Sequence, residues 1–405
     1  MSSPLQAAAP LAGSVAVPCC PSCGGGRLSP LYSLDRIPVQ SCILLDSREE
    51  AIKFPRSALD LQFCADCGFI YNAAFDEKLV DYASTTEESQ HFSDTFNTFA
   101  RELVAQIGAR HDLAGKLVLE VGCGKGDFLL YLIEHTGCRG LGVDPGYIPE
   151  RLLAKGGEEI AFIRDYFDSS AIAEAPDFVV CRHTLEHIGP VATFVRDIAA
   201  TFGKDRDVGI FFETPDMRRI LEEGAFWDIY YEHCSYFTAG AHARLFEREG
   251  MRVDDVHLAY DDQYIIQYAR AEQGFTGSGA FDAELDEVRR LAAAFPDKVR
   301  AVQEKWRRFL AERKAQGKKI AIWGGGSKGV SFLTSADFTA QVDQVIDINP
   351  YKQGKFVPGT GHEVLSPDQL PADPPDAVIV MNPIYVPEIR ELLASKGLSP
   401  ELVAV

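Results

Sequence analysis

Short apolar runs alternate with helix-length segments through the middle of the chain. A helical pattern over residues 93–108 is followed by apolar runs over 116–121, 140–144, 177–181 and 208–213. Runs of this length, spaced by helices, are typical of buried parallel strands. The pattern therefore predicts a parallel sheet wrapped by helices.

A hairpin and a helical stretch follow this sheet. Residues 251–258 and 264–270 have strand patterns separated by a short polar turn at 260–263, which predicts a closing antiparallel hairpin. Residues 281–316 are charged and helix-forming, but they contain Pro296. Because proline interrupts a helix, we expect two helices here.

The two ends of the chain differ in pattern. Apolar runs over 319–323, 344–347, 377–381 and 402–405 predict a second, smaller α/β unit. Residues 18–72 are rich in turns and show only weak periodicity. The pattern alone therefore predicts no regular elements near the N-terminus.

Charge and composition exclude several classes of protein. Forty Lys and Arg residues against 59 Asp and Glu residues give a net charge of −19 and a pI near 4.9. A nucleic-acid-binding chain is expected to be basic, so no nucleic-acid partner is expected. No apolar run approaches the roughly 18 residues of a membrane span, so no membrane partner is expected either. Residues 1–17 lack a basic signal-peptide segment, which favours a frayed terminus on a cytoplasmic protein.

Four of the ten cysteines form two Cys-x-x-Cys pairs, Cys20 with Cys23 and Cys64 with Cys67, each followed by a glycine. Two such pairs can hold one tetrahedral zinc ion through four thiolates. The alternative is four cysteines buried as small apolar residues. Cys19 could replace Cys20 only by widening the pair spacing. A closed site of this kind has a structural role.

The first strand of the sheet leads into a glycine-rich turn, Glu-Val-Gly-Cys-Gly-Lys-Gly, at residues 120–126. A lone Gly-x-Gly is weak evidence, because dinucleotide-binding folds share it. Here an acidic residue precedes the glycines, a phosphate-binding spacing is missing, and Asp144 ends the next strand. These features favour a ligand with a ribose, whose hydroxyls would donate to Asp144. Gly122 and Gly124 have no Cβ, so the ligand can approach the backbone closely.

Asp165 and Tyr166 end a later strand-like run and are placed to hold an adenine, through the carboxylate and the ring face. The alternatives are a helix cap for Asp144 and a core position for Tyr166. The candidate cofactor-binding residues are Glu120, Gly122, Gly124, Gly126, Asp144, Asp165 and Tyr166.

The glycine run, with Asp144 and Asp165, resembles the S-adenosylmethionine site of the class I methyltransferases. With the cysteines in front and the α/β unit behind, nearly the whole chain resembles the three-part sugar C-methyltransferases of deoxysugar biosynthesis. The resemblance implies an α/β fold with a class I methyltransferase Rossmann-like sheet, a small N-terminal zinc-binding domain and a second, C-terminal Rossmann-like domain. It also implies S-adenosylmethionine and Zn²⁺ as cofactors and a nucleotide-linked 4-keto sugar as partner.

Pattern and resemblance together divide the chain into five parts. We expect a disordered N-terminus over 1–17, a zinc-binding domain over 18–80, a methyltransferase domain over 81–275, a helical linker over 276–316 and a Rossmann-like substrate-binding domain over 317–405.

Two histidine-bearing motifs follow strands of the sheet, at residues 182–187 and 226–237. Their mixture of aromatic and titratable residues predicts an aromatic-walled pocket. Methylation of a carbon beside a ketone requires a base, and His233 is the natural candidate, with Glu232 or Tyr230 tuning or orienting it.

The family's Tyr-x-Glu-His-like motif, which carries the base, matches Tyr230, Glu232 and His233. His187 matches a family histidine that lines the substrate site, whereas His183 stands where the family usually has Asn. Alternatively, His183 and His187 share one face of a helix, or His233 is structural. The candidate catalytic residues are His233, Tyr230, Glu232 and His187.

A second glycine turn, residues 324–329, has Gly-x-Gly-x-x-Gly spacing. Taken alone, this spacing predicts an NAD-binding site. The methyl-donor site already accounts for the reaction, however, so the backbone amides of this turn and Lys328 could instead hold the diphosphate of a nucleotide-linked substrate. The alternative is a turn that only packs helix on strand. In this turn, Val330 stands where the family has an Asn. In another part of the chain, the segment that begins at Tyr82 resembles a family segment that closes over the pocket. The candidate substrate-binding residues are Tyr82, His183, Gly324, Gly326, Lys328, Asp347 and Asn382.

The sequence therefore predicts a zinc-stabilised, S-adenosylmethionine-dependent methyltransferase of a nucleotide-activated keto sugar, transferring to carbon through an enolate with a His base. One alternative is an O-methyltransferase of a sugar or small polar metabolite. Another is a non-catalytic nucleotide-sugar binding protein, against which Glu120, Gly122, Gly124 and Asp144 argue.

Overall fold

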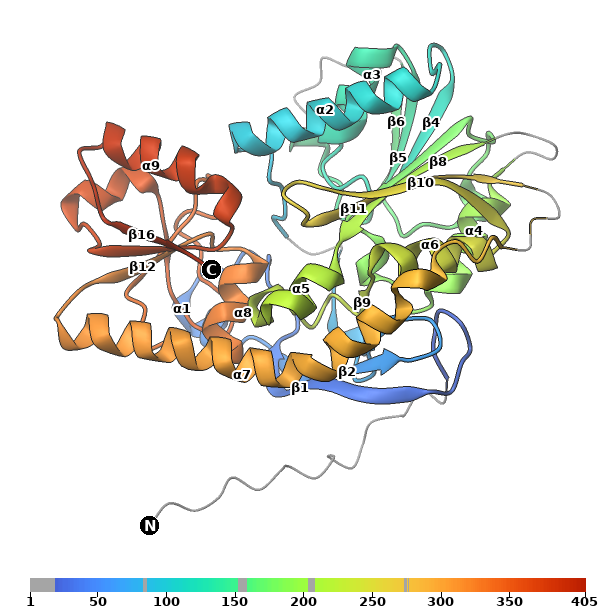
Figure 1. Ribbon diagram of the computed structural model, residues 1–405. Helices are drawn as coiled ribbons and strands as arrows, with labels where there is room; N and C mark the ends of the chain where they lie inside the picture. The colour runs from blue at the N-terminus through green and yellow to red at the C-terminus, as the bar shows by residue number, and fades with distance from the viewer. Residues whose placement is uncertain (1–18, 83–85, 152–158, 203–207, 273–274, 276) are drawn as a thin grey trace.

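The computed structural model describes residues 19–82, 86–151, 159–202, 208–272, 275 and 277–405. The expected disorder of residues 1–17 falls outside these ranges. The described chain forms three sheets, of four, seven and five strands (Figure 1).

The seven-stranded sheet has the order β10-β11-β8-β7-β4-β5-β6. Strands β4 to β8 run parallel, and β11 pairs antiparallel with both β8 and β10. The predicted parallel sheet and closing hairpin are therefore confirmed. The strands are β4 (Leu117–Val121), β5 (Arg139–Val143), β6 (Ile160–Ile163), β7 (Phe178–Arg182), β8 (Gly209–Pro215), β10 (Met251–Ala259) and β11 (Tyr264–Ala271).

Helices cover both faces of this sheet, which explains why its central parallel strands are mostly apolar. Val118 and Val180 pack against α2 and α3 on one face, whereas Leu119 and Val179 pack with residues of α4 and α6 on the other. Side chains alternate between the faces of a strand, so a strand covered twice has no polar side. The helices are α2 (Asp94–Arg110), α3 (Asp127–Thr136), α4 (Val191–Ala200) and α6 (Ala239–Arg248).

The N-terminal sheet has the order β1-β2-β3-β9, and its last strand comes from the segment assigned to the methyltransferase domain. Neither β1 nor β2 was predicted from the sequence. Register shifts break the alternation of buried and exposed residues in β1, whereas β2 does alternate over Leu59 to Phe63, so its local signal was overlooked. The elements are β1 (Leu28–Pro38), α1 (Arg48–Lys53), β2 (Arg56–Cys64), β3 (Ile70–Asn72) and β9 (Ser235–Tyr236). The domain boundaries stay a prediction.

The C-terminal sheet is parallel throughout, with the order β14-β13-β12-β15-β16. Its strands confirm the predicted second α/β unit. The elements are β12 (Ile320–Trp323), α8 (Ser327–Ser335), β13 (Gln344–Ile346), β14 (Val364–Leu365), β15 (Ala377–Val380), α9 (Val386–Ser395) and β16 (Glu401–Ala404).

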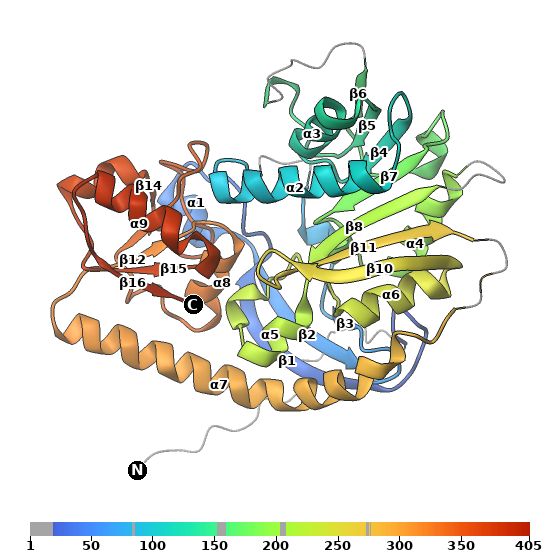
Figure 2. The ribbon, with the colours of Figure 1, turned by 45° about the horizontal axis from the view of Figure 1, so that its top comes forward.

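One long helix, α7 (Leu285–Ala315), connects the two larger sheets, so the expected break at Pro296 is wrong. Proline removes one N–H from the helix and normally kinks or ends it. Here a buried stripe runs across the proline, with Phe295 and Val299 on either side of it. The stripe packs against β1 and α5 (Met217–Glu223) and holds both halves in one helix, which runs along one side of the molecule (Figure 2).

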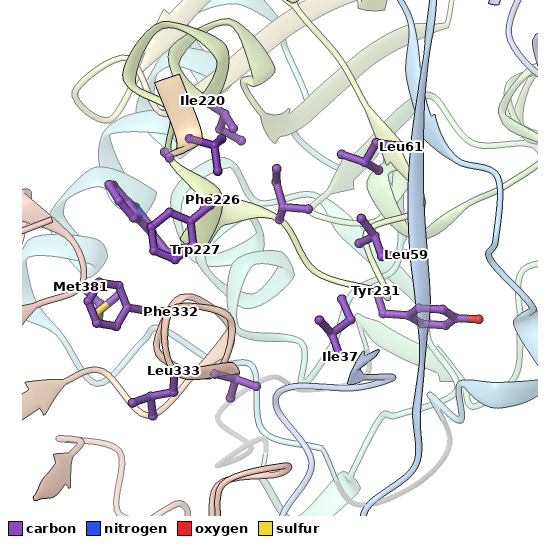
Figure 3. Close-up of a cluster of buried hydrophobic side chains, with 14 of the residues drawn as sticks. Ile37, Leu59, Leu61, Ile220, Phe226, Trp227, Tyr231, Phe332, Leu333 and Met381 are labelled. Carbon is purple, nitrogen blue, oxygen red and sulfur yellow. The ribbon is translucent and has the colours of Figure 1, made fainter. Parts of the chain in front are cut away.

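The largest core cluster joins the N-terminal and C-terminal sheets with α5 and the segment after α5, which belong to the methyltransferase part. Figure 3 shows side chains from β1, β2, α5 and α8 gathered around the segment that begins at Phe226. Phe226 is fully buried, and its ring centroid lies 5.2 Å from that of Trp227 and 5.8 Å from that of Phe332 in α8. The three parts therefore share one core and pack as a single body.

We expect Phe226→Ala to lower the free energy of unfolding by about 3 to 5 kcal/mol, because it leaves a cavity where the three parts meet. Ile52→Ala, at a side chain that is 46% exposed, serves as the control and should change it by about 0.5 kcal/mol or less. Urea unfolding followed by circular dichroism measures both variants. Equal midpoints for Phe226→Ala and Ile52→Ala would contradict the shared core.

Candidate active site

A cleft of about 2310 Å³ is lined by the carboxyl ends of the seven-stranded sheet, the segment after β8 and the C-terminal unit. It brings together both glycine turns and both histidine motifs. All the predicted cofactor, catalytic and substrate residues line it except Gly126 and Asp165. The predicted site therefore forms one continuous space.

Gly126 and Asp165 are the two predicted cofactor residues that do not line the cleft. Gly126 precedes α3 with φ of +88°, so it serves the turn into the helix. The Asp165 carboxylate accepts a hydrogen bond from the N–H of Tyr166 at 2.8 Å and lies exposed outside the cleft lining. Tyr166 does line the cleft and is 56% exposed, so the alternative of a core position for it is wrong.

The two glycine turns are held by the same device. In the first turn, the Asp144 carboxylate accepts from the N–H groups of Gly124 at 2.8 Å and Gly146 at 2.7 Å. In the second, the Asp347 carboxylate accepts from the N–H groups of Gly325 and Asn349, both at 2.9 Å. Each aspartate thus fixes the shape of its turn, in addition to any contact with a ligand.

Two residues of the first turn have features that suit a bound ligand. Gly124 has φ of +54°, and a Cβ there would meet only Glu88 Oε1, at 3.9 Å, so its backbone is open to the cleft. Glu120 is buried, which raises its pKa to about 8, and its Oε2 has no hydrogen-bond partner among the described residues. A buried carboxyl oxygen without a partner is costly, so a polar ligand group beside it is favoured.

His233 lies in the cleft between two other rings. Its centroid is 4.7 Å from that of His187 and 4.6 Å from that of Tyr230, both edge to face. Burial and the neighbouring histidines lower the pKa of His233 well below its usual value. His233 is therefore neutral near pH 7 and has a nitrogen lone pair that can accept a proton.

His187 is oriented by two oxygens. Its Nδ1 lies 2.8 Å from the Tyr82 hydroxyl and 3.1 Å from the backbone oxygen of Glu232. The helix-face alternative for His183 and His187 is wrong, because residues 185–187 form only a short 3-10 turn.

The Glu232 carboxylate is engaged away from His233. It accepts hydrogen bonds from the N–H of Ser41 at 3.2 Å and from the Ser41 hydroxyl, which also contacts the Ser327 hydroxyl at 2.8 Å. Glu232 thus links the N-terminal part, the segment after β8 and the second glycine turn. The expected orientation of His233 falls to Tyr230, whose ring contacts it and whose hydroxyl donates to Asp228 at 2.9 Å.

His183 belongs to a buried network that sequence reasoning missed. Its Nδ1 lies 3.5 Å from Glu186 Oε1 and its Nε2 lies 3.2 Å from Glu213 Oε1. Burial lowers the pKa of His183, but Glu213 and Glu186 outweigh it and raise the pKa to about 9. Arg182 donates to Glu213 at 2.5 Å, so positive and negative groups alternate along the network from Arg182 through Glu213 and His183 to Glu186. The only sequence signal was the adjacency of Arg182 and His183.

The cations of the second turn have internal partners. Lys328 Nζ lies 3.0 Å from Asp228 and 3.2 Å from Gln263, and burial lowers its pKa. Asn382 accepts from Gln263 at 3.1 Å. Lys352, which was not predicted, places Nζ 3.2 Å from where a Cβ on Gly326 would lie. Lys352 Nζ also lies 3.7 Å from Asp347 Oδ2, so each cation at this turn is paired with a carboxylate that lines the cleft.

The four paired cysteines lie together beside the N-terminal sheet. Cys20 Sγ is 3.7 Å from Cys67 Sγ, Cys23 Sγ is 3.7 Å from Cys64 Sγ, and all four sulfurs lie within 4.8 Å of one another. Thiolates around a tetrahedral zinc ion at 2.3 Å are about 3.8 Å apart. The spacing fits zinc and is too long for a disulfide.

Within the described ranges, none of the helices combines the length and the apolarity that crossing a membrane requires.

Comparisons with known proteins match both larger parts. Residues 90–256 match the family described as a methyltransferase domain, and residues 281–397 match the family described as a C-methyltransferase C-terminal domain. The chain is 30% identical over 311 residues to the C-methyltransferase NovU of Streptomyces niveus, a match that covers 70% of this chain and 71% of NovU.

Solved structures give more distant matches. The 1,6-didemethyltoxoflavin-N1-methyltransferase of Burkholderia thailandensis is 22% identical, with 44% of this chain and 82% of that chain covered and a TM-score of 0.36. The magnesium protoporphyrin IX methyltransferase of Synechocystis PCC 6803 is 15% identical, with coverage of 47% and 90% and a TM-score of 0.36.

We expect Gly122→Ala to destabilise the first turn for two reasons. Its φ of +73° disfavours a Cβ by about 1 to 2 kcal/mol, and the added Cβ would lie 1.8 Å from Thr184 Oγ1. Gly115→Ala is the matched control, because Gly115 has φ of +70° and open space. Urea unfolding should give a loss larger by about 1 to 3 kcal/mol for Gly122→Ala. Equal losses would show that Thr184 does not restrict this turn.

Proposed function

Because the chain belongs to the S-adenosylmethionine-dependent C-methyltransferase family, we propose that it methylates a carbon beside the ketone of a nucleotide-linked sugar. Membership of this enzyme family disfavours a non-catalytic binding protein, and its C-methyltransferase members favour carbon over oxygen as the methyl acceptor. The single observation that carries the proposal is the position of the neutral His233 between two glycine turns in one cleft.

The first turn is the proposed cofactor wall. The open backbone at Gly124 and the unpartnered Oε2 of Glu120 fit a ligand with polar groups, and Asp144 keeps the turn in shape while its carboxylate lines the cleft. When bound, S-adenosylmethionine supplies an electrophilic methyl group. Asp165 enters this proposal only if its carboxylate turns from the N–H of Tyr166 toward the adenine.

The second turn is the proposed nucleotide wall. The N–H of Gly326, the first N–H groups of α8 and the ammonium groups of Lys328 and Lys352 would bind the diphosphate, because the N–H groups of Gly324 and Gly325 already donate to Ile346 and Asp347. Lys328 already pairs with Asp228, so binding an anion would exchange one partner for another. This arrangement places the sugar toward the histidines in the middle of the cleft.

His233 and Tyr82 divide the proton chemistry. His233 takes the proton from the carbon beside the ketone, and the electron pair moves to the ketone oxygen to form an enolate. The Tyr82 hydroxyl, which is hydrogen-bonded to His187, donates to that oxygen and stabilises its developing charge. The enolate carbon would then form a bond to the methyl group as the sulfur–methyl bond of the cofactor breaks, which leaves the thioether S-adenosylhomocysteine and restores the ketone.

We also propose that the four cysteines hold one structural zinc ion. Their sulfur spacing supports this assignment, and four thiolates leave no coordination position open for catalysis. Zinc would then hold the turn before β1 against the turn after β2.

We expect His233→Asn to lower turnover by about 10² to 10⁴ fold, because the amide keeps a similar size but cannot accept the proton. Cofactor affinity, measured by calorimetry, should not change. His257→Asn, in β10 beside Asp255, is the control and should retain activity.

Isotope exchange separates transfer to carbon from transfer to oxygen. In D₂O, a keto-sugar substrate should gain deuterium beside the ketone with wild-type protein but not with His233→Asn. A methylated product that retains the full carbon-bound hydrogen of the substrate would reject the enolate and favour O-methylation.

Elemental analysis should find one zinc ion per chain at the cysteine site. Cys64→Ala should lose this metal and unfold at a lower temperature, because the ion links two distant turns. Cys138→Ala, a buried cysteine of the methyltransferase part, is the control and should keep the metal. Full zinc content in Cys64→Ala would refute the assignment.

A further inference from the structure

A second group of potential metal ligands lies inside the cleft. A carboxylate oxygen of Glu186 and one ring nitrogen each of His187 and His233 lie within 4.8 Å of one another. We propose that these three side chains bind a divalent transition-metal ion, separate from the cysteine site, and that this ion blocks the base. Two imidazoles and one carboxylate are typical ligands of Zn²⁺, Co²⁺ and Fe²⁺.

Glu186 has the arrangement expected of a carboxylate ligand. The residue is 2% exposed, and its Oε1 faces His183 Nδ1 at 3.5 Å. Its Oε2 is buried and has no hydrogen-bond partner among the described residues. Leaving a carboxylate oxygen buried and unpaired is costly, and a bound cation removes that cost.

The hydrogen bonds of His187 leave its Nε2 for a metal. Its Nδ1 lies 2.8 Å from the Tyr82 hydroxyl and 3.1 Å from the backbone oxygen of Glu232. The Glu232 oxygen can only accept a hydrogen bond, which favours the tautomer with the proton on Nδ1 and the lone pair on Nε2. Metal-bound histidines are commonly oriented by this contact between the other ring nitrogen and a carbonyl oxygen.

His233 completes the set as a neutral ring. The structure gives its ring no hydrogen bond within the described residues, only edge-to-face contacts with His187 and Tyr230. A bound ion would draw the three ligand atoms to roughly 3.4 Å from one another, which small side-chain rotations achieve. The ion and a substrate proton would then compete for the same lone pair. This effect on turnover rests on the proposed function, whereas metal binding does not.

Cobalt titration tests the site directly. The full-length protein, with zinc already on its cysteines, is titrated with Co²⁺ and followed by calorimetry and visible absorption. We expect one further equivalent with weak d–d bands and no thiolate-to-cobalt charge-transfer band. Glu186→Gln and His187→Ala should each weaken binding by at least about 10 to 100 fold. His257→Ala is the control and should bind as wild type does.

Three results would overturn the site. These are no equivalent beyond the cysteine zinc, a thiolate signature on the added cobalt, or wild-type affinity in the near-isosteric Glu186→Gln variant. Circular dichroism of each variant shows whether a loss of binding reflects unfolding, and Zn²⁺ displacement of bound Co²⁺ from the wild type gives a measurement that needs no variant.

Activity separates this proposal from the proposed function. Added Zn²⁺ should inhibit methyl transfer reversibly, and a chelator too weak to remove the cysteine zinc should restore it. Turnover without any cobalt binding would reject the metal site and leave the function standing. Cobalt binding without turnover of keto-sugar nucleotides would reject the proposed function and leave the metal site standing.

Discussion

Burial of one aromatic segment determines where the reactive side chains lie. Phe226 and Trp227 are buried in the core where the three parts of the chain meet, and so is Tyr231, whose hydroxyl accepts from the N–H of Asp76 at 2.9 Å. The residues beside them, Tyr230 and His233, line the cleft instead. Packing on one side of the segment thus fixes the groups on the other side, as a precise site requires. A methyltransferase part without its N-terminal and C-terminal neighbours would lose this support.

Two glycine turns line this cleft, and an aspartate accepts backbone hydrogen bonds at each of them in the same arrangement. In each, an aspartate at the end of the next strand accepts one N–H from the glycine turn and one from its own loop, Asp144 in one sheet and Asp347 in the other. The repeated geometry puts two such turns on the wall of a single cleft. The chain as a whole is acidic, so attraction of an anionic substrate has to come from a few local cations such as Lys352.

The sequence predicted what depends on local pattern and missed what depends on distant contacts. The buried parallel strands, both glycine turns and the Tyr230 to His233 motif were recognisable because each signal lies within a few residues. The pairing of Glu232 with Ser41 joins residues 191 positions apart, and no pattern indicates it. Pro296 shows the reverse case, since a clear local signal for a break was overridden by tertiary packing of the surrounding stripe.

The low basicity of His233 constrains the reaction. Burial keeps this ring neutral, so it is ready to accept a proton, but the same burial makes the imidazolium costly to form. A weak base can remove only a proton that its surroundings have made more acidic. In the proposed reaction, the enolate oxygen must therefore be stabilised while the proton leaves, which would assign equal weight to the Tyr82 hydroxyl and to the His187 ring that orients it. Base and oxyanion donor act as one unit, so removing either group should cost most of the rate that both supply.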